Sequence, residues 1–445
     1  MKLAIKEDRA DLAEADRRDG RGGLKAAIGR APVTAAVDLG ASKVACFILK
    51  PDGVRQVDRT ITAAGVGYVQ SRGVRGGVVV DVDEAANSIA QAVERAETLA
   101  GVHVSGVTVT TAGGRLASQR LSATVSLGAR PISDPDLSRA LAAAMAGCKL
   151  PGRRVIHVRP IAWSVDGQKG VRDPRSMFGR QLGLQLLVVT LDEPVFQTLS
   201  HCVERAHLEF NGVVAAPFAS ALAALEDDEM SLGAILIDMG GGSTSVAVYS
   251  GGSLVHVDSL AVGGGHVTQD VARGLSTSIV GAERIKTLHG SAIASSNEDR
   301  EMIEAPPRGD DPAAGPVVAP RSLLKGIIAP RVEETLELLR ERLKSANAPI
   351  EPGAGVVLTG GASQLAGVRE VAVRVFDRPV RLGRPRRIPH LADAASGPAF
   401  CAAAGVLHRA AFGPREAAAN RSSTSRQGQA AGPVSRAAAW LRENL

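Results

Sequence analysis

Residues 37–49 read VDLGASKVACFIL and residues 237–249 read IDMGGGSTSVAVY, so two stretches 200 residues apart share one pattern. Each places an aspartate, Asp38 or Asp238, at the end of a short apolar strand, followed by a turn of small residues and a returning apolar strand. Apolar runs joined by such a turn are typical of β-hairpins. A chain that carries this unit in both halves is predicted to be pseudo-symmetric.

The two turns have the composition of phosphate-binding loops. Glycine and hydroxyl residues leave backbone N–H groups open to phosphate oxygens. A single copy is more often an ordinary hairpin, whereas two matching copies favour a phosphate site. Asp38 and Asp238 precede the turns, where a hydrated Mg²⁺ would separate each carboxylate from phosphate. The candidate phosphate residues are Gly40, Ser42, Lys43, Gly240, Gly241, Gly242, Ser243 and Thr244.

A third glycine site follows the stretch GVVLT at residues 355–359, which reads as a buried strand. Gly360, Gly361 and Ala362 come next and are expected to open a helix. This arrangement suits close approach of an adenosine or a phosphate to the backbone.

Composition excludes several classes of protein. At roughly 150 residues per domain, 445 residues suggest about three domain-sized units. A net charge of +6, scattered among carboxylates, and 3% aromatic residues argue against a nucleic-acid partner. The four cysteines are far apart and lack metal-ligand spacing, so we expect reduced thiols in a cytosolic protein. No run of 18 apolar residues occurs, and we expect neither a membrane-spanning helix nor a secretory signal.

Periodicity predicts the main helices and the segments that lie outside them. A helix is expected over residues 82–100, ended by Gly101, and another begins near Asp134. Residues 291–320 are rich in Pro, Gly, Asp and Glu and are expected to form an exposed excursion. Residues 1–30 are expected to form a poorly ordered extension. Further helices are predicted over residues 193–208 and 218–229, from Pro330, from Ala362 and over residues 397–411.

The order of these segments resembles the actin, chaperone ATPase and sugar kinase superfamily, in which two halves close on ATP. The hairpins resemble its two phosphate segments, and GVVLTGGAS at 355–363 resembles its adenosine segment. Its two hinge helices resemble VVAAPFASALAAL at 213–225 and SGPAFCAAAGVLH at 396–408.

Within the superfamily the chain is similar to the FtsA family, bacterial cell-division proteins that tie FtsZ filaments to the membrane. The similarity covers residues 33–413 and the terminal helix. The stretches that carry it are PFASALAALEDDE at 217–229, GAILIDMGGGSTSVAVYSGG at 233–252, HVTQDVA at 266–272 and APRVEE at 329–334.

The resemblance implies an α/β, actin-like two-lobed ATPase fold with an FtsA-type α+β insert subdomain and a C-terminal amphipathic helix. The expected parts are subdomain 1A at 31–81, 192–232 and 396–413, the inserted subdomain 1C at 82–191, subdomain 2A at 233–269 and 347–395, subdomain 2B at 270–346, a linker at 414–431 and the amphipathic helix at 432–445.

For the site, the resemblance implies that the two turns surround the phosphates of ATP, with Asp38 and Asp238 near Mg²⁺. Glu283 and Lys286, three residues apart on one helix face, match positions that hold the ribose and purine. Without the resemblance, a solvated surface salt bridge is the better interpretation of this pair. Chaperone ATPases place a glutamate just before the proline of the first hinge, whereas this chain has Ala215 and Ala216. We therefore expect slow turnover at most.

Residues 432–445 return to helical periodicity. Thirteen or so residues are too short to span a bilayer but can lie in its surface. The alternative is a helix that folds back onto the protein or binds another partner, and the FtsA resemblance favours the membrane. The apolar arc is formed by Val434, Ala437, Ala438, Leu441 and Leu445, with Trp440 at its edge.

The resemblance also implies partners. Subdomain 2B would receive the C-terminal peptide of FtsZ, and Arg321, Lys325 and Arg331 are exposed candidates for its acidic residues, although each fits a solvated basic face equally well. Copies of the chain would polymerise, and other division proteins would dock on the insert. The expected location is the cytoplasmic face of the inner membrane at the division septum. The alternatives are a small-molecule kinase of the same superfamily and an actin-like adaptor of pilus assembly.

Overall fold

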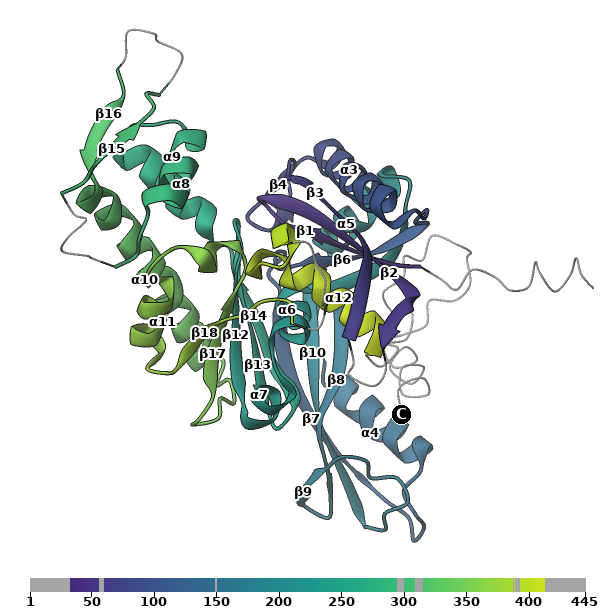
Figure 1. Cartoon of the computed structure of the whole chain (residues 1–445). Helices are drawn as coiled ribbons and strands as arrows, with labels where there is room; N and C mark the ends of the chain where they lie inside the picture. Colours follow the sequence, from purple (N-terminus) through teal and green to yellow (C-terminus); the bar gives the residue numbers. More distant parts are fainter. Residues whose placement is uncertain are drawn as a thin grey trace, which may run out of the picture.

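The computed structural model describes residues 33–55, 60–148, 150–293, 300–308, 315–386, 388 and 393–412. The predicted extension at 1–30, the linker and the amphipathic helix lie outside these residues. Two lobes stand side by side, and a third unit extends from between them (Figure 1). Within the described part of the chain, no helix combines the length and the apolar character needed to cross a bilayer.

The first lobe is built on a five-stranded sheet in the order β11-β6-β1-β2-β3. Its central strand β1 pairs antiparallel with β2, as the hairpin pattern predicted, and parallel with β6. The strands are β1 (Thr34–Leu39), β2 (Lys43–Arg55), β3 (Thr60–Gln70), β6 (Gly106–Thr111) and β11 (Glu209–Ala215).

The second lobe repeats this arrangement in the order β18-β17-β12-β13-β14. Strand β12 pairs antiparallel with β13 and parallel with β17, as β1 does with β2 and β6. The predicted pseudo-symmetry is therefore confirmed strand by strand. The strands are β12 (Ala234–Met239), β13 (Thr244–Ser250), β14 (Ser253–Leu260), β17 (Gly355–Thr359) and β18 (Val380–Leu382).

Helix α3 (Val82–Ala100) has the predicted bounds. Asp81 accepts a hydrogen bond from the Glu84 N–H at its start, and Gly101 ends it in the left-handed region at φ 62°. The buried face of α3 packs on β2 and β3, and β6 lies inside the first sheet. The structure thus places residues 82–111 in the first lobe, so the inserted unit begins later than the predicted Val82.

The insert is a four-stranded antiparallel sheet covered by one helix, with its own apolar core around Leu137, Leu141 and Leu186. Helix α4 begins at Asp134, as predicted. The elements are β7 (Ala117–Ser126), α4 (Asp134–Ala146), β8 (Arg153–Val165), β9 (Gln168–Val171) and β10 (Gln181–Asp192).

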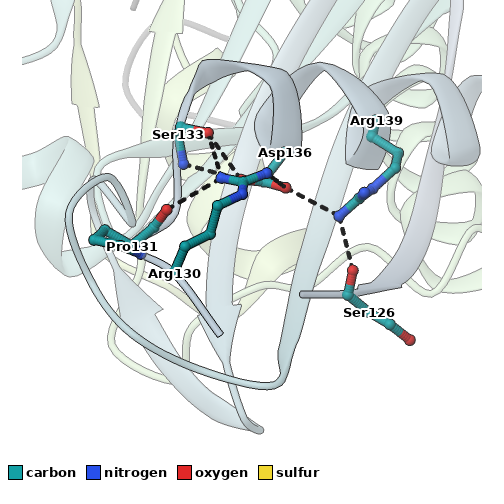
Figure 2. A network of polar contacts seen from close by, with 6 residues as sticks. All are labelled: Ser126, Arg130, Pro131, Ser133, Asp136 and Arg139. Carbon is teal, nitrogen blue, oxygen red and sulfur yellow. Dashed lines mark hydrogen bonds and ion pairs between the residues drawn. The ribbon is translucent and has the colours of Figure 1, made fainter. Parts of the chain in front are cut away.

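A buried carboxylate holds the start of α4 in place (Figure 2). Asp136, with 2% of its side chain exposed, accepts two hydrogen bonds from Arg130, at 2.8 and 3.0 Å, and one from Arg139 at 3.0 Å. It also accepts from the backbone N–H and the hydroxyl of Ser133. Arg139 reaches on to the Ser126 carbonyl at the end of β7, so one carboxylate joins the helix to the sheet.

The insert sheet continues into the second lobe through a single residue pair, Ala117 of β7 with Asp258 of β14, which gives one nine-stranded sheet. The Ser118 hydroxyl accepts from the Val257 N–H at 2.7 Å and donates to the Val257 carbonyl at 2.8 Å. Arg120 donates to the Asn347 carbonyl at 2.7 Å, just beyond α10 (Arg321–Ser345). Strand β8 of the insert also contacts β11 of the first lobe, so the insert contacts both lobes.

Two buried helices, α6 (Ala216–Ala224) and α12 (Cys401–Phe412), pack against each other between the lobes. Helix α6 is shorter than the predicted 218–229 helix, because the backbone is extended at Leu225 before the separate α7 (Asp227–Leu232). Helix α12 follows a single 3-10 turn at Pro398–Phe400.

The second lobe differs from prediction in three places. Helix α10 begins at Arg321, and Pro330 lies inside it because apolar residues on both sides, such as Ile328 and Val332, are buried in the core. The predicted excursion contains a two-stranded sheet, β15 (Met302–Ala305) with β16 (Val317–Pro320). The helix expected from Ala362 is a 3-10 turn at Gly361–Gln364, and α11 (Val368–Phe376) starts later. The remaining main helices are α5 (Glu193–Arg205), α8 (Gly264–Gly274) and α9 (Ile279–His289).

Candidate functional site

The two glycine turns face each other across one cleft between the lobes. A Cβ atom added to Gly241 would lie 1.9 Å from the Ser42 hydroxyl, and one added to Gly242 would lie 2.7 Å from the Ala41 Cβ. The cleft has a volume of about 570 Å³. Every residue predicted for phosphate, metal, ribose or purine lines it, namely Asp38, Gly40, Ser42, Lys43, Asp238, Gly240, Gly241, Gly242, Ser243, Thr244, Glu283, Lys286, Gly360, Gly361 and Ala362.

The turns have the same local structure. The Gly40 N–H donates to the Lys43 carbonyl at 3.1 Å, and the Gly240 N–H donates to the Ser243 carbonyl at 2.9 Å. Each bond closes the turn directly after the aspartate of the preceding strand. The repeated pattern read from the sequence is thus a repeated geometry.

A hydroxyl group orients each aspartate. Thr110 on β6 donates to Asp38 at 2.5 Å, and Ser220 on α6 donates to Asp238 at 2.6 Å. Burial, with a smaller contribution from the nearby charge of Asp38, raises the pKa of Asp238 to about 6 against the opposing effects of the Ser220 hydrogen bond and Lys43. Burial likewise raises the pKa of Asp38, against the opposing charge of Lys43. Both carboxylates are therefore poorly solvated, a state that a bound cation would relieve.

Lys43 connects the first turn to the second hinge. Its ammonium group donates to the Ala399 carbonyl and lies 4.3 Å from the centre of the Phe400 ring. Burial lowers the pKa of Lys43, while the charges of Asp38 and Asp238 raise it. One lysine thus lies between the two aspartates and the segment that leads into α12.

The donor set fits hydrated Mg²⁺ rather than a metal held by protein ligands alone. The described residues contain no group of three or more His, Cys, Asp or Glu side chains that could hold an ion. The Thr244 and Ser245 hydroxyls are buried at the cleft and have no hydrogen-bond partner among the described residues. Two carboxylates with hydroxyls nearby suit Mg²⁺, which usually keeps several waters and binds one or two carboxylates together with phosphates.

A further glycine segment, Gly263 to Gly265, was not predicted. The Gly264 N–H donates to the Gly240 carbonyl at 2.9 Å, and the Gly265 N–H donates to the Gly241 carbonyl at 2.7 Å. These bonds place the N-terminus of α8 beside the second turn, where the helix favours negative charge. Three consecutive glycines before a helical segment are the signal from which the sequence could have indicated it.

Gly360 occupies a position that only glycine fills without strain. Its φ is 83°, and a Cβ there would lie 2.4 Å from the Asp238 carboxylate. The next residues close a 3-10 turn, in which the Ser363 hydroxyl donates to the Gly360 carbonyl at 2.7 Å. This segment brings bare backbone against the second aspartate in the wall of the cleft.

Glu283 and Lys286 form an ion pair of 2.7 Å in the wall of the cleft. Only 12% of the Lys286 side chain is exposed, and its ammonium group also donates to the Thr268 hydroxyl at 2.8 Å and to the Gly264 carbonyl at 3.2 Å. Thr268, which the sequence did not single out, donates in turn to Glu283. Because the Lys286 side chain is constrained in this way, it differs from the lysine of a solvated surface salt bridge, which was the alternative interpretation of this pair.

The first hinge offers no water-activating side chain at its start. Ala216 lines the cleft, and the Ala215 N–H donates to the His157 imidazole at 3.0 Å. Methyl groups cannot accept a proton.

The exposed character predicted for the three basic partner candidates is wrong for Lys325, which is 5% exposed. Because α10 starts at Arg321, Lys325 falls between Leu324 and Ile328 on the buried face. Arg321 lies in the cleft wall. Arg331 is partly exposed and pairs with Asp270 and Glu334, both at 2.6 Å. The predicted membrane residues Val434, Ala438, Trp440, Leu441 and Leu445 lie outside the described residues.

Solved structures show which fold this is. The chain is similar to the PilM-PilN type IV pilus biogenesis complex, with a TM-score of 0.61 and 16% identity over 86% of this chain and 99% of that one. It is also similar to MreB 5 of Spiroplasma citri bound to AMPPNP, with a TM-score of 0.50 and 16% identity over 85% of this chain and 96% of that one. The fold is actin-like, as expected.

Sequence comparisons are more specific. The model of the family described as "Cell division protein FtsA" matches residues 235–405, and that of the "SHS2 domain inserted in FTSA" matches residues 113–190, the insert. The chain is 41% identical over 432 residues to cell division protein FtsA of Rhizobium meliloti (strain 1021), covering 94% of this chain and 96% of that protein. It is 31% identical over 381 residues to FtsA of Escherichia coli (strain K12), covering 84% and 89%. The chain therefore belongs to the FtsA family of cell division proteins.

Proposed function

We propose that the protein binds Mg·ATP between its lobes, polymerises, and anchors FtsZ filaments to the cytoplasmic face of the inner membrane at the division septum. The observation that carries the nucleotide part is the pair of glycine turns facing each other across one cleft. Phosphates would lie between Gly40 to Lys43 and Gly240 to Thr244, with the α8 N-terminus beside them.

In this proposal Asp38 and Asp238 hold the waters of Mg²⁺, which neutralises phosphate charge when bound. Thr110 and Ser220 keep the two carboxylates pointed toward the cleft. Glu283 and Lys286 hold the ribose and purine, and Gly360 to Ala362 lie along the adenosine. The missing base at Ala215 and Ala216 supports slow turnover at most, so nucleotide would regulate a scaffold.

The outer subdomain of the second lobe is the proposed site for the FtsZ C-terminal peptide (Figure 1). Large apolar side chains are exposed there by 46% to 81% and are available to pack against apolar residues of a peptide. Arg331 is the remaining basic candidate for acidic peptide residues. The apolar residues are Ile279, Val280, Met302, Val318 and Leu323.

Residues 432–445 are the proposed membrane anchor. Their apolar arc is rich in alanine, so one copy binds a bilayer weakly. Polymerised copies would bind together and gain affinity through effective concentration. Other division proteins would dock on the insert.

Co-pelleting with anionic vesicles and FtsZ tests the scaffold part, using the full chain and a chain that ends before Val434. Truncation is expected to abolish vesicle binding and to leave FtsZ binding intact. Vesicle binding that survives truncation would contradict the anchor. For the nucleotide part, titration with Mg·ATP is expected to give binding that Asp238→Ala strongly weakens. Equal binding by this variant would remove the second turn from the site.

A further inference from the structure

We propose that Arg321 positions the purine ring of the bound nucleotide by laying its guanidinium plane against the base. The inference rests on the proposed nucleotide binding. It reassigns a residue that the sequence suggested for a protein partner.

The Arg321 side chain is held firmly in the cleft wall. It belongs to the first residue of α10, and only 18% of it is exposed. Its Nε donates to the His289 carbonyl at 3.0 Å, and its Nη1 donates to Glu301 at 2.8 Å. The Arg321 N–H also donates to the Glu301 carbonyl at 2.7 Å. A guanidinium fixed at both ends has little rotamer entropy left to lose when a ligand binds.

A series of contacts places Arg321 at the end of the cleft that would receive the purine base. The second phosphate turn is bonded to Gly264, and Gly264 accepts a hydrogen bond from Lys286. His289, which holds Arg321, lies almost one turn further along α9 than Lys286. A nucleotide whose phosphates occupy the turns would therefore reach Arg321 with its base, after its ribose has passed Glu283 and Lys286.

The surroundings of Arg321 suit a flat aromatic ring rather than a phosphate. Leu288 and Leu365 line the same cleft, and Leu288 is 61% exposed although it is a large apolar side chain. A phosphate gains nothing from leucine side chains, whereas a purine covers them and stacks on a guanidinium face. Glu301 accepts a hydrogen bond from Arg321, and this bond restricts rotation of the guanidinium plane.

Three variants test this assignment: Arg321→Ala, Arg321→Lys and the control Arg331→Ala. Arg331 is on the same helix and is paired with acidic residues, and it does not line the cleft. The ligands are Mg·ATP, magnesium tripolyphosphate and the fluorescent analogue etheno-ATP. Circular dichroism and thermal unfolding check that each variant is folded.

Arg321→Ala is expected to weaken Mg·ATP binding about tenfold, because the contact between the guanidinium and the base is lost. The affinity for magnesium tripolyphosphate, measured by competition, should change less than twofold, because this ligand has no base. Arg321→Lys keeps the charge without the plane and should lose nearly as much. At saturation, etheno-ATP on either Arg321 variant should be quenched more readily by acrylamide than on wild type or Arg331→Ala.

Unchanged Mg·ATP affinity and quenching in Arg321→Ala would overturn the assignment. An equal loss for ATP and tripolyphosphate would overturn it too, because it would indicate a general role in folding the cleft. Wild-type chain that binds no Mg·ATP at all would overturn the proposed nucleotide function itself, a result distinct from a defect confined to the Arg321 variants.

Discussion

Gly405 of α12 lies against the Ala219 carbonyl of α6 so closely that a Cβ atom on Gly405 would be 1.7 Å from that oxygen. The two hinge helices therefore touch backbone to backbone at this point. Both are buried, and α12 also packs on β1 and β2 of the first lobe. A side chain at residue 405 would push apart the helices that join the lobes.

Gly405→Ala is expected to lower the free energy of unfolding by about 3 kcal/mol, the upper range for overpacking a core, because the obstacle is backbone that cannot rotate away. Urea unfolding at neutral pH measures it. Gly326→Ala is the control, since no atom lies within 4 Å of its Cβ position and it is inside α10. That variant should be neutral or up to about 1 kcal/mol more stable. Equal stability of the two variants would contradict the close contact.

Asp238 should make the nucleotide-free protein less stable as the pH rises. Its folded pKa of about 6 is above the ordinary value of 3.8, so the stability it contributes is complete below about pH 4 and is lost as the pH rises through 6. The loss is on the order of 3 kcal/mol. Unfolding measured from pH 4 to pH 8 should show this fall in wild type and a smaller one in Asp238→Asn. Parallel curves would contradict it.

Mg·ATP binding should show the opposite pH dependence. A protonated Asp238 cannot hold the waters of Mg²⁺ as a carboxylate does, so affinity should weaken below about pH 6. Isothermal titration at pH 5, 6 and 7.5 measures this. A pH-independent affinity would indicate that Asp238 does not hold the metal.

Asp136→Asn is expected to destabilise the insert by roughly 2 kcal/mol at pH 7, because Arg130 and Arg139 lose a charged partner. Burial raises the pKa of Asp136, but the hydrogen bonds and charge of Arg130, together with Ser133, outweigh it and lower the pKa below its ordinary value. The contribution of this carboxylate is thus present above about pH 4 and lost below it. The difference between wild type and Asp136→Asn in urea unfolding should therefore narrow as the pH is lowered below about 4 toward the lowered pKa of Asp136.

Asp134→Asn is the matched control for that measurement. Asp134 is in the same helical turn, but 69% of its side chain is exposed and its nearest arginine nitrogen is 3.7 Å away. Such a pair contributes little to stability. A loss in Asp134→Asn as large as that in Asp136→Asn would refute the role of the buried network.

Charge reversal in α10 should separate binding from folding. Arg331→Glu is expected to keep the fold and to weaken FtsZ-peptide binding at least tenfold in fluorescence anisotropy, with less effect at high salt. Lys325→Glu puts a carboxylate into the buried face of α10 and should lower the melting temperature instead. If Lys325→Glu melts like wild type, its burial is refuted. Peptide affinity unchanged in Arg331→Glu would remove that residue from the proposed site.

The repeated hairpins could be predicted because their information is local. Asp38 and Asp238, the small-residue turns and the returning strands are contiguous in sequence, and the structure has them with that geometry. Helix α3 was equally predictable, since Asp81 and Gly101 mark its ends directly. Gly360 and Gly361 could be identified for the same reason, because they directly follow the apolar run at residues 355–359.

The residues that complete the site could not be predicted in this way, because their partners are distant in sequence. Thr110 is 72 residues from Asp38, and Ser220 is 18 residues from Asp238 on a different element. Pro330 suggested a helix start, since proline favours the first turn, yet α10 already runs from Arg321. That error hid the burial of Lys325 and the position of Arg321 in the cleft.

The single residue pair between Ala117 of β7 and Asp258 of β14 joins the insert to the second lobe, so the insert is supported by both lobes. The insert is covalently continuous with the first lobe, and hydrogen bonds from Ser118 and Arg120 hold it on the second. If one lobe rotates about α6 and α12, the insert must either move with it or lose the pairing between Ala117 and Asp258. The affinity of any molecule that binds the insert would then depend on the angle between the lobes. By thermodynamic reciprocity, binding of that molecule would shift the angle in return.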